Sequence, residues 1–223
     1  MKCFNPFIEG KREKSIYLEH EVKAILREMG ISVPKGFYAK KGTSLSDIVE
    51  RAFLLSYPLV AKVSSPLIPS KTDVGGVRTG IRDEESLKRA VIELFDIKES
   101  EGVLVEEMVP EGLEVIVGGV IDEQFGPIMM FGIGGVFVEI FRDVAFGLSP
   151  LKKEDALWMI GQIKAYPLLK GYRGSLPVDI DTLADLMVSI SEVMAKGNIK
   201  EIDLNPVVLY PKGAIVVDAK MKI

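Results

Sequence analysis

Three oxygen-bearing side chains lie close together near the end of the sequence. Asp203 and Asn205 alternate with apolar residues in the stretch 201–209, and Asp218 ends a second apolar stretch at 214–218. A short turn with proline, lysine and glycine separates the stretches, so the pattern predicts a β-hairpin. Two carboxylates and a carboxamide suit a hard cation such as Mg²⁺, which takes its other ligands from water and substrate phosphates. Alternatively, Asp203 and Asn205 are the solvent-facing residues of an edge strand.

A lysine interrupts an apolar stretch in the first half of the chain. The stretch 59–63 predicts a buried strand in which Lys62 is the single charge. A lysine in such a place costs free energy unless something pairs with it. Either its ammonium binds a nucleotide phosphate, or the side chain extends from the strand end into solvent. The following loop contains hydroxyls, Lys71 and the pair Gly75-Gly76, so it is able to offer hydroxyls and backbone N–H groups to phosphate oxygens.

Composition limits the class of protein. The chain has 223 residues, 48% hydrophobic and 27% charged, so it is able to bury a substantial core. A net charge of -4 argues against a nucleic acid or a membrane surface as the main partner. No apolar run approaches the ~20 residues of a membrane span, and the N-terminus lacks a signal-peptide pattern. We therefore expect a cytoplasmic protein.

Two residue types occur once each. The single cysteine, Cys3, excludes an internal disulfide framework and a cysteine-based zinc site. The single histidine, His20, lies between Glu19 and Glu21 and off the apolar stripe of its helix, so we expect it on the solvated surface. Many Lys, Glu and Ile residues with few Asn and Gln residues are compatible with a thermophilic source.

Apolar residues recur at helical spacing in five segments, and short apolar runs between them predict strands. Ser15 is the expected N-cap of the first helix, and Asp181 or Thr182 that of the last. Helices on mixed sheets give an α+β fold with a tail at 1–15, a first lobe at 16–105 and a second at 106–223. The expected helices are 15–29, 46–56, 83–95, 152–165 and 181–196, and the expected strands are 59–63, 77–81, 103–105, 113–115, 201–209 and 214–218.

An acidic segment that contains a proline follows the predicted strand 103–105. It includes Glu106, Glu107 and Val109, and Glu114 begins the next strand. Such a segment is able to serve as a hinge whose backbone N–H and C=O groups bind an adenine edge, while Glu114 binds ribose hydroxyls. Taken singly, each glutamate is equally explained as a solvated loop charge.

In order and spacing, these features together resemble an ATP-grasp nucleotide domain. More narrowly, the chain is similar to the beta subunits of ADP-forming acetate–CoA ligases, which are relatives of the succinyl-CoA synthetase beta subunit. The resemblance covers nearly the whole chain from about residue 16 and includes long runs at 125–139, 163–169 and 171–174. It implies the ATP-grasp fold, with two lobes and the nucleotide, ATP or ADP with Mg²⁺, between them.

The resemblance also implies a reaction and a partner. The enzyme is a ligase that forms a carbon–sulfur bond, and its reaction is acyl-CoA + ADP + phosphate ⇌ carboxylic acid + ATP + CoA. A CoA-binding alpha subunit, in a heterooligomer such as α2β2, forms an acyl phosphate and passes the phosphoryl group to its own histidine. The present chain would then phosphorylate ADP, which is mainly a matter of positioning and charge neutralisation.

Site residues follow from the resemblance, position by position. The glycine-rich run 132–135, followed by Glu139, would be a loop near the transferred phosphate, although a turn between two strands explains it equally well. The implied catalytic residues are Lys62, Ser70, Arg142 and Glu139; the nucleotide-binding residues are Lys62, Lys71, Gly75, Gly76, Glu106, Glu107, Val109 and Glu114; and the metal ligands are Asp203, Asn205 and Asp218.

Two departures from the family pattern leave the function open. Ser70 stands where relatives carry a histidine thought to relay the phosphoryl group, and a serine cannot return a phosphoryl group as easily as imidazole does. Gly147 stands where many relatives carry an arginine able to clamp phosphate, which leaves Arg142 and Arg173 as candidates for that charge. The chain is therefore either a working beta subunit or a nucleotide-binding regulatory or assembly subunit. A stand-alone carboxylate ligase is disfavoured because no separate substrate domain is visible.

Overall fold

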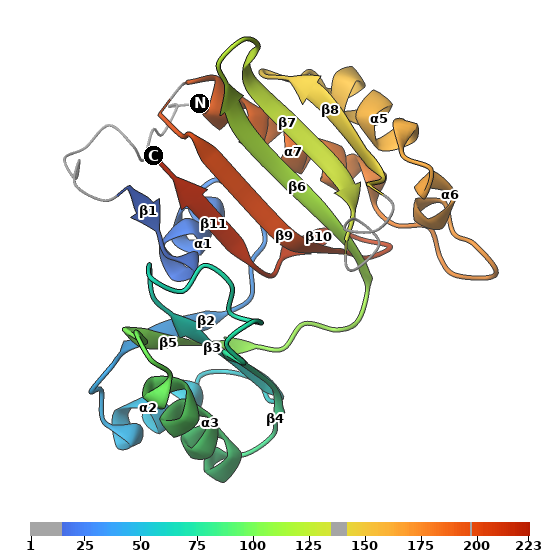
Figure 1. Ribbon diagram of the computed structural model, residues 1–223. Helices are drawn as coiled ribbons and strands as arrows, with labels where there is room; N and C mark the ends of the chain where they lie inside the picture. The colour runs from blue at the N-terminus through green and yellow to red at the C-terminus, as the bar shows by residue number, and fades with distance from the viewer. Residues whose placement is uncertain (1–14, 135–141, 197) are drawn as a thin grey trace. The chain divides into compact units, whose positions relative to one another are not determined.

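The computed structural model describes residues 15–134, 142–196 and 198–223, so most of the expected N-terminal tail lies outside the described residues. The chain forms two compact units (Figure 1). The larger unit takes its described residues from Met1–Tyr17, Glu21–Val33 and Glu111–Ile223, and the smaller unit comprises Leu18–His20 and Pro34–Pro110. Neither unit is continuous in sequence, whereas the expected lobes were continuous and met at 105/106.

The smaller unit is built on an antiparallel sheet of four strands in the order β2-β5-β3-β4. Helix α3 packs on β3, β4 and β5, and α2 packs on α3. Both helices begin at side-chain caps: Ser44 accepts the N–H of Asp47, and Asp83 accepts the N–H of Ser86. The elements are β2 (Gly36–Lys40), α2 (Leu45–Ala52), β3 (Leu59–Ser64), β4 (Val77–Ile81), α3 (Glu84–Asp96) and β5 (Gly102–Glu107).

The larger unit is built on a sheet in the order β1-β11-β9-β6-β7-β8, with β10 also paired to β9. Helix α7 packs on β6 and β7, and α5 packs on α7, β7 and β8. The strands are β1 (Ile16–Tyr17), β6 (Leu113–Asp122), β7 (Gly126–Ile133), β8 (Val144–Leu148), β9 (Glu201–Leu209), β10 (Ala214–Val216) and β11 (Ala219–Lys222); the helices are α1 (Glu19–Glu28), α5 (Lys153–Gln162), α6 (Tyr166–Leu169) and α7 (Ile180–Ala195).

Strand alternation divides the residues of the larger sheet between two faces. Ile202 and Leu204 of β9 are buried in the same core as Met187 of α7. Asp203 and Asn205 therefore lie together on the face of the sheet opposite α7, and the sequence predicted that they share a face.

Asp179 joins α7 to the turn between β9 and β10. Its carboxylate accepts the N–H of Thr182 at 3.0 Å, the Thr182 hydroxyl at 2.8 Å and the N–H of Gly213 at 2.9 Å. These hydrogen bonds to the charged form lower the pKa of Asp179. Asp179, rather than Asp181 or Thr182, is thus the N-cap of the last helix.

Three further expectations about secondary structure were wrong in detail. Ser15 does not cap the first helix, because Ile16 and Tyr17 pair with β11 and the helix begins at Glu19. All strand pairings between described residues are antiparallel, whereas the sequence predicted mixed sheets. The strand expected at 103–105 continues to Glu107 because it pairs with β2 and β3 along that length.

Within the described ranges, no helix has the length and apolar character needed to span a membrane.

Candidate nucleotide and metal site

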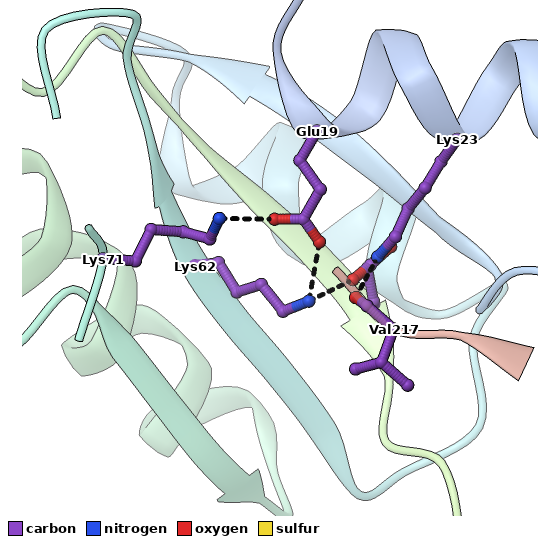
Figure 2. A network of polar contacts seen from close by, with 6 residues as sticks. Glu19, Lys23, Lys62, Lys71 and Val217 are labelled. Carbon is purple, nitrogen blue, oxygen red and sulfur yellow. Dashed lines mark hydrogen bonds and ion pairs between the residues drawn. The ribbon is translucent and has the colours of Figure 1, made fainter. Parts of the chain in front are cut away.

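Lys62 does not extend into solvent; its ammonium lies among carboxylates. Its Nζ lies 2.7 Å from Oε1 of Glu19 and 3.1 Å from Oε2 of Glu106. The Nζ of Lys71 lies 3.1 Å from the other oxygen of Glu19. Figure 2 shows the two lysines directed at the two oxygens of Glu19. We call Glu19, Lys62, Lys71 and Glu106 the lysine cluster.

The lysine cluster is buried and balanced in charge. The most exposed of its side chains, that of Lys71, has a relative exposure of 11%, and that of Glu106 has 3%. Buried charges cost free energy unless they are paired, and two carboxylates meet two ammonium groups here. The sequence left the partner of Lys62 undecided, and the structure pairs its ammonium with two glutamates.

The loop between β3 and β4 is closed by its own hydrogen bonds. The N–H of Gly75 donates to O of Thr72 at 3.0 Å, and the N–H of Gly76 donates to O of Lys71 at 2.6 Å. Gly75 has a φ of +61°, and a Cβ on Gly76 would lie 2.3 Å from Cγ1 of Val63. Both glycines therefore serve the turn and its packing, and their N–H groups are engaged within the loop rather than presented to a phosphate.

Ser70 lies in the same loop, directly before Lys71. Its Oγ accepts a long hydrogen bond of 3.4 Å from the N–H of Asp73. The side chain is half-buried. Ser70 is thus placed beside a lysine of the cluster, with a hydroxyl that already bonds its own turn.

The segment after β5 offers one backbone donor. Glu107 donates its N–H to O of Lys35 and accepts the N–H of Ser56 with its carboxylate, both over 2.8–2.9 Å. Met108 donates its N–H to O of Pro58 at 2.9 Å. Among the described residues, no hydrogen bond uses the N–H of Val109. Of this segment, Val109 is therefore the residue whose N–H is able to bind an adenine edge.

Asn205 and Asp218 are neighbours in the larger sheet. The N–H of Asn205 donates to O of Asp218 at 3.1 Å, at the point where β10 gives way to β11. Asn205 is exposed and Asp218 half-buried. Asp203 is the register partner of Lys220 across β9 and β11, so it faces a cation as well as the expected metal position. We call Asp203, Asn205 and Asp218 the acidic face.

The acidic face fits Mg²⁺ by the chemistry of its donors. Carboxylate and amide oxygens are the ligands that hard cations take, and Mg²⁺ keeps several waters, for which an exposed Asn205 leaves room. The described residues contain no group of three or more His, Cys, Asp or Glu side chains able to hold a metal by themselves. Asn205 and Asp218 would thus be a partial set of ligands, of the kind that substrate phosphates and water complete.

Glu114 and the glycine-rich run meet at β6 and β7. The N–H of Gly134 donates to O of Glu114 at 2.8 Å, and a Cβ on Gly134 would lie 2.8 Å from the backbone of Glu114. The side chain of Glu114 is exposed, on the face opposite the core residue Val115. Glu139 lies outside the described residues.

Gly147, Arg142 and Arg173 are the positions that the sequence singled out in connection with a phosphate-binding arginine. Gly147 lies on the helix-covered face of β8, where a Cβ would meet Sδ of Met159 at 2.6 Å and Cδ2 of Leu151 at 3.0 Å. A side chain at this position would therefore start against core residues of α5 and of the segment before it. Arg142 and Arg173 are exposed and have left-handed backbone angles of +47° and +52°, a conformation that non-glycine residues adopt mainly in turns and at functional sites.

Sequence reasoning missed two residues of α1 and misplaced a third. Glu19 is 7% exposed and Lys23 is 2% exposed, and Nζ of Lys23 donates to O of Val217 at 2.6 Å, directly before Asp218. His20 is half-buried and stacks on Tyr38 with ring centroids 4.1 Å apart, so it is not the solvated histidine that we expected. The sequence did contain a signal, because Glu19 and Lys23 are opposite charges four residues apart beside an apolar stripe. Such a pair more often lies on a solvated helix face.

Comparison with known proteins places the chain in a family. The ATP-grasp domain family matches residues 10–223. The chain is 42% identical to acetate–CoA ligase [ADP-forming] I subunit beta of Pyrococcus furiosus over 221 residues, which are 96% of this chain and 94% of that subunit. It is 40% identical to acetate–CoA ligase [ADP-forming] II of Archaeoglobus fulgidus, and the match covers 92% of this chain but 30% of that longer protein.

A solved structure agrees with this match. The chain resembles the acetyl-coenzyme A synthetase 1 of Ca. Korarchaeum cryptofilum, with a TM-score of 0.82 and 42% identity over 94% of this chain and 93% of that one. That structure is a complex with coenzyme A and Mg-AMPPCP, and its phosphohistidine segment points towards the nucleotide binding site. The chain therefore belongs to the ATP-grasp family, in the group that includes the beta subunits of ADP-forming acetate–CoA ligases.

Proposed function

We propose that the chain is the nucleotide-binding beta subunit of an ADP-forming acyl-CoA synthetase. The observation that carries the proposal is the match of 42% identity over 94% of a protein named as such a subunit. The longer relative, of which this chain matches 30%, supports a separate partner chain that supplies the remaining domains. That partner would be a CoA-binding alpha subunit.

The step proposed for this chain is phosphoryl transfer to ADP. The P–N bond of a phosphohistidine on the partner breaks, and a bond forms between that phosphorus and a terminal oxygen of ADP, which yields ATP and a free imidazole. The residues of this chain would position the nucleotide: Lys62 and Lys71 its phosphates, Val109 its base and Glu114 its ribose. When bound, Mg²⁺ would neutralise charge on the phosphates, held by Asn205 and Asp218.

The test is ATP formation from acyl-CoA, ADP and phosphate by this chain reconstituted with its cognate alpha subunit. We expect turnover by the wild-type chain and its loss in Asn205→Ala. Omitting the alpha subunit should abolish turnover, because the phosphohistidine belongs to that subunit. No turnover with a folded, assembled complex would contradict the proposal.

A second candidate rests on Ser70, whose Oγ accepts a hydrogen bond from Asp73 at 3.4 Å and which cannot relay a phosphoryl group as a histidine would. In this alternative the chain binds nucleotide but serves as a regulatory or assembly subunit. The variant Ser70→His separates the two. If only that variant turns over while the wild-type chain still binds Mg-ADP, the alternative holds; if the wild-type chain turns over, phosphoryl transfer does not need a histidine in this loop.

A further inference from the structure

Glu19 is the one residue of the lysine cluster that contacts both lysines. Its Oε1 lies 2.7 Å from Nζ of Lys62, and its Oε2 lies 3.1 Å from Nζ of Lys71. Each oxygen therefore serves a different ammonium group (Figure 2). The carboxylate fixes two cations at once, and their separation follows from its geometry.

The two lysines come from parts of the fold with different constraints. Lys62 lies in β3, which pairs on both sides, with β4 and with β5. Lys71 lies in the loop between β3 and β4, where the next residues, Thr72 and Asp73, are exposed. A long lysine side chain on such a loop has many rotamers to lose. Glu19 supplies a contact that holds this side chain next to the lysine of the strand.

Glu106 does not replace Glu19 in this role. Its Oε2 lies 3.1 Å from Nζ of Lys62, and its strand β5 already pairs with β3 along the whole length from Leu59 to Ser64. Loss of Glu19 would thus take one carboxylate away from Lys62 and would remove the ion pair between Glu19 and Lys71.

We propose that Glu19 is a positioning residue for the nucleotide phosphates, acting through Lys62 and Lys71. This inference rests on the proposed function, because it takes those lysines as the phosphate-binding groups. Preorganised cations bind an anion without the cost of ordering them at the moment of binding. Glu19 itself, being an anion, would not contact the phosphates.

The test compares a ligand that has phosphates with one that has none. In calorimetric titrations of the full chain, we expect Glu19→Gln to weaken Mg-ADP binding on the order of 10-fold, as loss of an orienting partner does at other sites. Adenosine, which has the base and ribose alone, should bind the variant and the wild-type chain equally. A merely structural role would weaken both ligands together.

Two further variants, a matched control and a conservative change, accompany Glu19→Gln. Glu28→Gln removes a carboxylate from the exposed side of the same helix and should leave both affinities unchanged. Glu19→Asp keeps the charge balance but reaches one methylene less far, so it should fold and still lose several-fold in Mg-ADP affinity. Equal Mg-ADP affinity for wild type, Glu19→Gln and Glu19→Asp would overturn the inference and leave the proposed function standing. A wild-type chain that does not bind Mg-ADP would overturn both.

Discussion

The lysine cluster and the acidic face are the two charged regions that we propose hold a ligand, and they differ in burial. In the lysine cluster every side chain is at most 11% exposed and each charge has an opposite charge within 3.1 Å. On the acidic face, Asn205 is exposed and Asp218 half-buried. Buried charges must be satisfied within the protein, whereas a more exposed group leaves room for water and a ligand. Under the proposed function, the first region is organised before nucleotide binds, and phosphates and water complete the ligand set of the second.

The largest effect should follow from opening the lysine cluster. Lys62→Met would leave Glu19 and Glu106 buried without their shared cation, and breaking a buried pair in this way costs about 3–5 kcal/mol. The free energy of unfolding from denaturant titration measures it. Lys40→Met, an exposed lysine in the neighbouring strand β2, is the matched control. Equal stability of the two variants would show that the cluster is not a preorganised region.

A change on the acidic face should act on activity rather than stability. We expect Asp218→Ala to lower ATP formation by the reconstituted complex about 100-fold, the size of effect that follows loss of a group stabilising charge in a transition state. The melting temperature should change little, since the side chain is only half-buried. Glu192→Ala, an exposed carboxylate in α7, should retain full activity. If Asp218→Ala did not fold, the acidic face would act on stability as the lysine cluster does. That outcome would contradict the proposed difference between the two regions.

Replacement of Lys23 should lower the free energy of unfolding by less than replacement of Lys62. It is 2% exposed, and its ammonium donates to the carbonyl of Val217 at 2.6 Å, so Lys23→Met would leave a half-buried acceptor without this donor, at a cost of about 1–3 kcal/mol. The free energy of unfolding is again the measurement. Lys164→Met, an exposed lysine of the same unit, serves as the comparison, and an equal response from both would contradict the structural role of Lys23.

We expect the smallest change in stability from replacement of Asp179. Because hydrogen bonds lower its pKa, its carboxylate stabilises the fold at pH values above its unfolded pKa of about 3.9, and this contribution is lost as the pH falls through the lower folded value. Asp179→Asn keeps a helix cap but loses acceptor capacity for Gly213, which we expect to cost about 1 kcal/mol near pH 7. The difference from wild type should shrink as the pH falls below the unfolded value of about 3.9 and through the lower folded value. A difference independent of pH would contradict this explanation.

The acidic face was predictable because it depends on local periodicity. Alternation at Asp203 and Asn205 placed them on one face, and the tight turn predicted the pairing of β9 with β10. The sequence did not show that residues after Asp218 pair with the first half of β9. That pairing is with Ala219–Lys222, and it also draws Ile16 and Tyr17 into the sheet in place of the expected helix start.

The lysine cluster was not predictable in the same way. A lone lysine in an apolar strand showed that a partner was needed, but Glu19 lies 43 residues away in sequence. Local spacing carries no information on such a contact. Gly147 illustrates the same limit, because only its position against Met159 and Leu151 shows that it faces the core.

Calorimetric titration of ADP into the full chain, with and without Mg²⁺, tests the central claim most directly. The account predicts saturable binding of one ADP per chain that weakens strongly when Mg²⁺ is omitted, and that loses its dependence on Mg²⁺ in Asn205→Ala. Absence of binding by the folded wild-type chain, or an affinity that is the same with and without Mg²⁺, would contradict it.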